Sequence, residues 1–100
     1  MSDQAADPVL LSLREEIAAA DRDLVAAFAR RLQAAARIRS HKQECGYALV
    51  DPEREQLLLA EWREANDGTI PDEALLELYE IVLALSKREA AGESRPAEPS

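Results

Sequence analysis

The fold is decided by residues 8–45, which read PVLLSLREEIAAADRDLVAAFARRLQAAARIRSHKQEC. After Pro8 this stretch contains no proline and no glycine, and alanine and leucine dominate it, which favours one uninterrupted helix. At 1.5 Å per residue such a helix is about 55 Å long, whereas a compact chain of this size has a radius of gyration of only about 13 Å. We therefore expect the helix to extend beyond its own domain.

Apolar residues recur along this helix at alternating spacings of three and four, the pattern of a helix that packs against another helix. The apolar stripe consists of Leu10, Leu13, Ile17, Ala20, Leu24 and Ala27, and the same spacing continues through Arg31, Ala34 and Ile38. Because the stripe is too long for its own chain to cover, the sequence predicts a second copy. Arg14, Arg31 and Lys42 lie in or beside the stripe, and cations in that position suggest an anionic ligand inside a helical dimer.

Helix-start and helix-stop residues divide the chain into three helices. Asp7-Pro8 and Asp51-Pro52 each combine an N-capping aspartate with a proline in the first turn. Gly46 is placed to end the first helix, and a short loop over residues 46–50 precedes a second helix over 52–65. Its buried side is expected to carry Leu57, Leu58 and Trp62.

A third helix is expected to open at Pro71, after a turn at residues 66–68, and to end near Ala91 or Gly92. Its inner face is predicted to consist of Leu75, Leu78, Tyr79, Val82, Leu83 and Ser86. The predicted fold is therefore all-α, with one helical domain over residues 8–92. Residues 1–7 and 93–100 are polar and are expected to be disordered tails.

Charge is divided unevenly along the chain. Residues 1–45 hold seven basic and seven acidic side chains, whereas residues 46–100 hold five basic and thirteen acidic ones and account for the whole net charge of -8. This balance argues against nucleic acid and membrane surfaces as partners. The cations that remain are concentrated on the first helix, where they indicate a local binding device.

The expected location is a reducing cytoplasm. Cys45 is the only cysteine, so an intrachain disulfide is impossible. The N-terminal residues lack the basic start and apolar run of a secretory signal, and no apolar stretch is long enough to span a membrane. One histidine and one cysteine cannot build a zinc site, and no credible nucleophile–base pair or glycine-rich phosphate loop is present. The sequence predicts no cofactor, so an enzyme here must work by binding and electrostatics.

Helical geometry places Arg31 and Lys42 on one face. Eleven residues at 100° each leave them about 20° from eclipsed and about 16 Å apart along the axis. Two such cations can clasp a small dianion, while Arg14 points about 100° away and can serve the site of the other copy. On the second helix Asp51, Arg54 and Glu55 share one face. The guanidinium of Arg54 can bind a carboxylate, and the carboxylates of Asp51 and Glu55 can accept a hydrogen bond from a hydroxyl.

Each of these residues also has an ordinary structural explanation. Arg31 can snorkel at the edge of a bundle, and Lys42 can complement the dipole at a helix C-terminus. Asp51 is first of all an N-cap. Ser86 is small enough to allow close packing between helices, and Glu89 can be an exposed charge on the helix surface.

Taken in order, these segments resemble the all-helical chorismate mutases. The resemblance lies in LREEI at residues 13–17, an aspartate at 21, an arginine at 31, a lysine eleven residues later and DPERE at 51–55. It implies an intertwined dimer of three-helix chains with two active sites in the bundle. The implied reaction is the [3,3] rearrangement of chorismate to prephenate, in aromatic amino-acid or related shikimate-derived biosynthesis.

The resemblance also implies a role for each candidate residue. Arg14 would be donated to the partner's site, Arg31 and Arg54 would hold carboxylates, and Lys42 would bind a carboxylate and the ether oxygen. Asp51 and Glu55 would meet the ring hydroxyl, Asp51 chiefly through its backbone. Ser86 matches the serine of the last helix.

The sequence departs from the family four residues after that serine. The family commonly places glutamine or glutamate there, against the ether oxygen, and this chain has Ala90. Glu89 is one residue away, and a shift in the register of the third helix would bring it inward as a catalytic donor if it is protonated.

Two kinds of alternative function stay open. One is a sister activity, either 4-amino-4-deoxychorismate mutase or isochorismate-pyruvate lyase. The other is a helical dimerisation module without catalysis. Some members of the family depend on a larger activating enzyme, and this chain is a candidate for such a partner.

Overall fold

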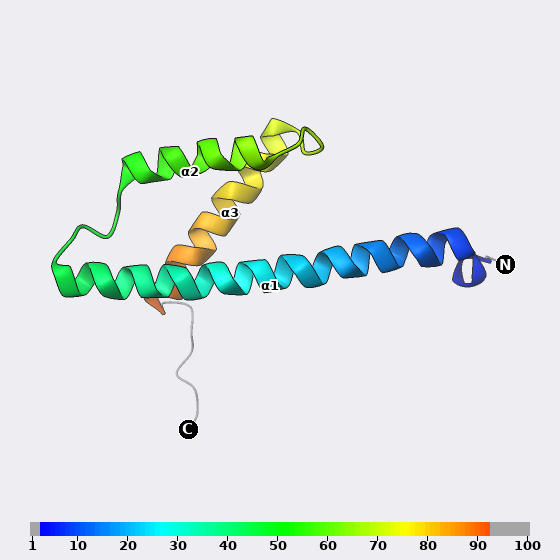
Figure 1. Cartoon of the computed structure of the whole chain (residues 1–100), viewed down its shortest axis with the longest axis horizontal. Helices are drawn as coiled ribbons and strands as arrows, with labels where there is room; N and C mark the ends of the chain where they lie inside the picture. Colours follow the sequence, from blue (N-terminus) through cyan, green and yellow to red (C-terminus); the bar gives the residue numbers. More distant parts are fainter. Residues whose placement is uncertain (1–2, 93–100) are drawn as a thin grey trace, which may run out of the picture. The chain divides into compact units, whose positions relative to one another are not determined.

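The computed structural model describes residues 3–92 and is all-helical over that range. It contains a short 3-10 turn, η1 (Gln4–Ala6), followed by α1 (Pro8–Cys45), α2 (Pro52–Ala65) and α3 (Asp72–Ala91). Figure 1 shows α1 as one unbroken helix, with α2 and α3 following it along the chain. The prediction of three helices is confirmed. Over residues 3–92, no helix combines the length and the apolar character that a bilayer crossing requires.

Only part of the two expected tails falls within the residues that the structure describes. The turn η1 occupies residues 4–6, where a tail without regular structure was expected. The expected disordered segment over residues 93–100 lies outside the described residues, as do residues 1 and 2.

The described residues fall into two compact units, one ending at Arg31 and the other beginning at Leu32. The first unit consists of η1 and the N-terminal part of α1. It begins with the predicted cap, because Asp7 Oδ1 accepts hydrogen bonds from Val9 N at 2.9 Å and Leu10 N at 3.3 Å. No described residue of this unit is buried, and Leu13, Ile17 and Leu24 are 49%, 61% and 62% exposed.

The second unit contains the end of α1 together with α2 and α3. Helix α1 ends in a Schellman motif at Gly46, whose φ of 72° is left-handed. Its amide donates to Gln43 O at 3.3 Å, and the amide of Tyr47 donates to Lys42 O at 2.9 Å. These two bonds satisfy carbonyls that the helix end would otherwise leave unpaired, so the predicted stop at Gly46 is confirmed.

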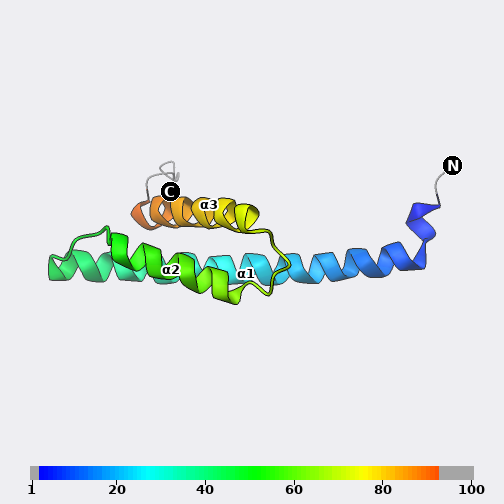
Figure 2. The same cartoon turned by 90° about the horizontal axis from the view of Figure 1, so that it is seen from above.

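Helices α2 and α3 are joined by a loop whose side chains fold back on its backbone. Asn66 Oδ1 accepts from the amides of Gly68 and Ile70, both at 3.2 Å, and its amide group donates to Ile70 O at 2.8 Å. Asp67 accepts from the amide of Thr69 at 2.9 Å, and hydrogen bonding from Thr69 lowers the pKa of the Asp67 carboxyl below its ordinary value of 3.8. The loop is thus an ordered reversal, and Figure 2 shows α2 and α3 on either side of it.

The core of the second unit lies between α2 and α3. Leu75 and Tyr79 are buried at 4% and 6% exposure, and the Tyr79 ring meets that of Trp62 edge to face, with centroids 5.4 Å apart. Leu58 and Trp62 of α2 are half-buried, as predicted. Leu57 and Leu78 are 60% and 39% exposed, so their assignment to the inner faces was wrong for the single chain. Leu57 precedes the half-buried Leu58 by one residue and Leu78 precedes the buried Tyr79, which turns each about 100° away from that face.

A hydrogen bond from the buried tyrosine of α3 links the two helices. Tyr79 Oη donates to the backbone carbonyl of Glu55 at 2.9 Å. The bond leaves the buried ring in place and gives its polar end a partner, as buried tyrosines require. It also holds the first turn of α2 against α3.

We predict that Tyr79→Phe lowers the free energy of unfolding by about 1 kcal/mol, because it removes this bond and keeps the ring packing. Chemical denaturation at a fixed protein concentration measures the change. Tyr47→Phe is the matched control, since Tyr47 is 63% exposed and its removal should have little effect. Equal losses in the two variants would contradict this role of Tyr79.

Candidate functional site

Two of the predicted site residues, Arg14 and Arg31, belong to the first unit. Both lie on α1, where Arg14 is exposed and Arg31 is half-buried. The partial burial of Arg31 occurs on a helix in which no described residue is fully buried. Along α1 these cations lie among exposed leucine and isoleucine side chains of the apolar stripe.

Lys42 is in the last turn of α1 and belongs to the second unit. Its Nζ donates to the backbone carbonyl of Leu49 at 3.3 Å, so it reaches across the loop that leaves the helix. Lys42 is half-buried and lines an open hollow of about 860 Å³ together with Arg37, His41 and Tyr47. Arg37, His41 and Lys42 border the hollow with nitrogen groups that can bind an anion, and Glu44 adds one carboxylate to the lining.

The start of α2 presents Asp51 and Arg54. Asp51 Oδ1 accepts from the Arg54 amide at 3.2 Å, which confirms Asp51 as the N-cap. The Arg54 guanidinium pairs with Glu61 at 3.3 Å, and the two side chains are 56% and 58% exposed. A pair so open to water contributes little, about 0–1 kcal/mol. A carboxylate ligand can therefore displace Glu61 at small cost.

Glu55 is held more firmly than its neighbours. Its Oε2 pairs with Lys87 Nζ at 2.9 Å, and its backbone carbonyl accepts the bond from Tyr79. The Glu55 side chain is 30% exposed, so it is partly withdrawn from water while its carboxylate is compensated by a cation from α3. This arrangement places an oriented acceptor where α2 and α3 meet.

The end of α3 carries Ser86 and Glu89. Ser86 is buried at 3% exposure, and its hydroxyl donates to Val82 O at 2.6 Å, one turn earlier in the helix. Glu89 pairs with Arg88 at 3.5 Å. Glu89 and Ala90 are both half-buried.

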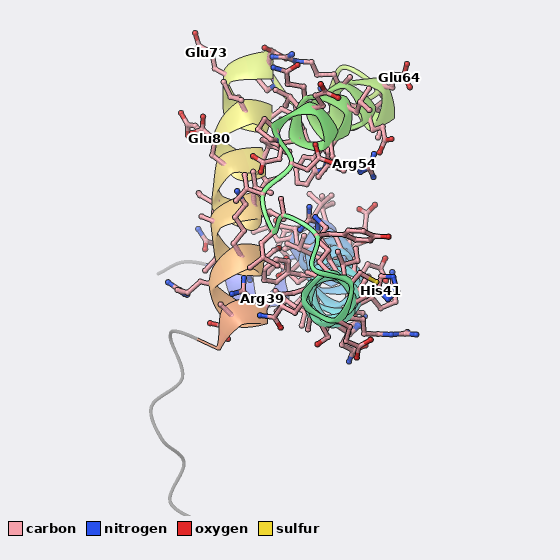
Figure 3. The ribbon with its side chains drawn as sticks, turned by 90° about the vertical axis from the view of Figure 1, so that its left-hand side faces the viewer. Arg39, His41, Arg54, Glu64, Glu73 and Glu80 are labelled. Atoms are coloured by element: carbon pink, nitrogen blue, oxygen red, sulfur yellow. The ribbon has the colours of Figure 1, made fainter. Side chains whose placement is uncertain are left out.

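Some of the acidic side chains of α2 and α3 point away from the junction of the two helices. Figure 3 shows Glu73 and Glu80 projecting from the side of α3 that faces away from α2. Glu64 projects from the opposite side of α2, and all three residues are exposed. These three carboxylates therefore do not oppose an anion at the junction of the two helices.

Sequence reasoning missed Lys87 and the hydrogen bond of Tyr79. Both residues meet Glu55 from α3, at separations of 32 and 24 residues. One feature that could have drawn attention to Lys87 is the rarity of lysine, because the chain has only two lysines. The other lysine is Lys42, which was already a candidate.

Residues 13–91 match the family described as chorismate mutase type II. Because the match covers most of the chain, the protein belongs to this family. The family is all-helical and its named activity is that of an isomerase, in agreement with the helices described above. No significant match was found among curated proteins or solved structures.

Proposed function

We propose that the protein is a homodimeric chorismate mutase that rearranges chorismate to prephenate for aromatic amino-acid or related shikimate-derived biosynthesis in the cytoplasm. The observation that carries the proposal is the family match over residues 13–91, which includes each of the eight candidate site residues. The half-buried Lys42 and the oriented Glu55 add support. A cation can bind a carboxylate of a dianion, and an oriented carboxylate can accept a hydrogen bond from its hydroxyl.

The exposed apolar stripe of α1 supports the dimer. Leu13, Ile17 and Leu24 are about half exposed or more. The intrinsic helix propensity of its residues stabilises an isolated helix in water only slightly. Burying one such side chain contributes about 1.5–3 kcal/mol. A second copy of α1, related by two-fold symmetry, covers the stripe with the same spacing of apolar residues.

The proposed chemistry requires no proton transfer and no cofactor. Arg31, Arg54 and Arg14 of the partner subunit fix the two carboxylates, so that the enolpyruvyl ether is held over the ring in a reactive conformation. As the C–O bond breaks and the new C–C bond forms, negative charge grows on the ether oxygen. Lys42 stabilises that charge more strongly in the transition state than in the ground state.

The remaining polar groups orient the ring. Glu55 accepts a hydrogen bond from the ring hydroxyl through its carboxylate, and Asp51 contributes from its backbone at the helix start. Ser86 and Glu89 complete the α3 side of the site.

The helix cations give a direct test of this function. We predict that Lys42→Ala and Arg31→Ala each lower kcat/KM for chorismate by about 100- to 1000-fold, the usual loss for a preorganised donor. The loss of ultraviolet absorbance of chorismate and chromatography of the product measure turnover. Circular dichroism should show unchanged helicity.

Arg30→Ala is the matched control, because Arg30 is exposed and adjacent to Arg31. It should retain wild-type activity. Addition of a larger partner enzyme tests for dependence on activation. If the wild-type protein at micromolar concentration leaves chorismate unchanged both alone and with that partner, the mutase proposal fails. Assays with isochorismate and 4-amino-4-deoxychorismate then separate the sister activities from a non-catalytic module.

The dimer has its own test. Leu24→Glu places a charge in the apolar stripe of both copies and should weaken association by at least about 100-fold. Sedimentation should give about twice the 11.0 kDa of one chain for the wild type and a shift toward one chain for the variant. Ala26→Glu is the control, because position 26 lies on the opposite face of the helix. A wild-type protein that sediments as a single chain at micromolar concentration would refute the dimer.

A further inference from the structure

The ion pair between Lys87 and Glu55 measures 2.9 Å and is shorter than the Arg54–Glu61 and Arg88–Glu89 pairs, at 3.3 and 3.5 Å. It joins α3 to the first turn of α2 across 32 residues of sequence. Lys87 is 51% exposed and Glu55 is 30% exposed, so the cation stands on the solvent side of the pair. Lys87 therefore reaches inward to the carboxylate from the rim of the helix junction.

Glu55 is fixed by α3 at two points. Its carboxylate is held by Lys87, and its backbone carbonyl is held by the buried Tyr79. A glutamate side chain loses substantial rotamer entropy when it is confined. Lys87 confines the Glu55 side chain, and Tyr79 holds the Glu55 backbone, before any ligand binds. This order reduces the entropy lost on binding.

We propose that Lys87 is a positioning and specificity-determining residue, which orients Glu55 and selects a ring hydroxyl over a ring ammonium in the substrate. The proposal rests on the proposed function and extends it to the choice between chorismate and its 4-amino analogue. Lys87 acts through Glu55, whereas Glu55 meets the substrate.

The selection follows from charge. An unpaired Glu55 beside Asp51 is an attractive site for a cation. Lys87 compensates the Glu55 carboxylate through Oε2, and its ammonium repels a second ammonium brought to the same carboxylate. A hydroxyl carries no net charge and needs only an acceptor, which Oε1 of the same carboxylate provides. The pair thus accepts the hydroxyl substrate and penalises the ammonium substrate.

The experiment compares the two substrates on the same protein. Values of kcat/KM for chorismate and for 4-amino-4-deoxychorismate are measured for the wild type, Lys87→Gln and Lys87→Arg. We expect Lys87→Gln to shift the ratio toward the amino substrate by about tenfold, the size expected for one unit charge at a partly exposed site. Lys87→Arg, which keeps the charge, should restore a ratio close to that of the wild type.

The ratio separates selectivity from a loss of structure, because a partly unfolded variant loses activity toward both substrates together. Arg63→Gln is the matched control, since it removes the exposed ion pair between Arg63 and Asp72 on the same two helices. Its ratio should be unchanged. A Lys87→Gln ratio within twofold of the wild type, with normal helicity, overturns the proposal about Lys87 and leaves the mutase function standing. A wild type that converts neither substrate refutes the mutase function and this proposal with it.

Discussion

The apolar stripe of α1 is the constraint on which the rest of this account depends. A helix of 38 residues is about 57 Å long, and its N-terminal unit contains no buried residue among those described. Leucine and isoleucine side chains that are exposed at regular helical spacing destabilise the helix in water until another surface covers them. Arginines placed in and beside such a stripe would be costly in a purely structural contact, because a desolvated cation needs an anionic partner. The proposed two-chain bundle, with a small dianion inside it, answers both requirements.

In the proposed function, the second unit supplies the groups that distinguish one dianion from another. Lys42 closes the end of α1 by binding the loop, and the Asp51 cap sets the start of α2. Tyr79 and Lys87 then attach that start to α3 through opposite ends of Glu55. Weak exposed pairing at Arg54 and firm pairing at Glu55 have different consequences. The first leaves a guanidinium ready to exchange partners, and the second presents a carboxylate in a fixed position.

The helix boundaries could be predicted from the sequence because local chemistry sets them. Asp7-Pro8, Gly46 and Asp51-Pro52 each act within one turn of the chain, and the structure confirms all three. The exposure of Leu57 and Leu78 could not be predicted with the same success, because it depends on how two helices are rotated against each other. The Lys87–Glu55 pair joins residues 32 positions apart, and no local pattern encodes such a contact. The dimer and the roles of the eight candidate site residues stay predictions.

The most direct test of the two-chain site mixes two variants that are each expected to be inactive, Arg14→Ala and Lys42→Ala. The subunits are exchanged by unfolding and refolding the mixture, and turnover of chorismate is measured. If Arg14 serves the partner's site, half of the dimers are mixed and one of their two sites is intact, which restores about a quarter of wild-type activity. If each chain uses its own Arg14 and Lys42, every site in the mixture is defective. A mixture as inactive as its components, in dimers shown to have exchanged, would contradict the account.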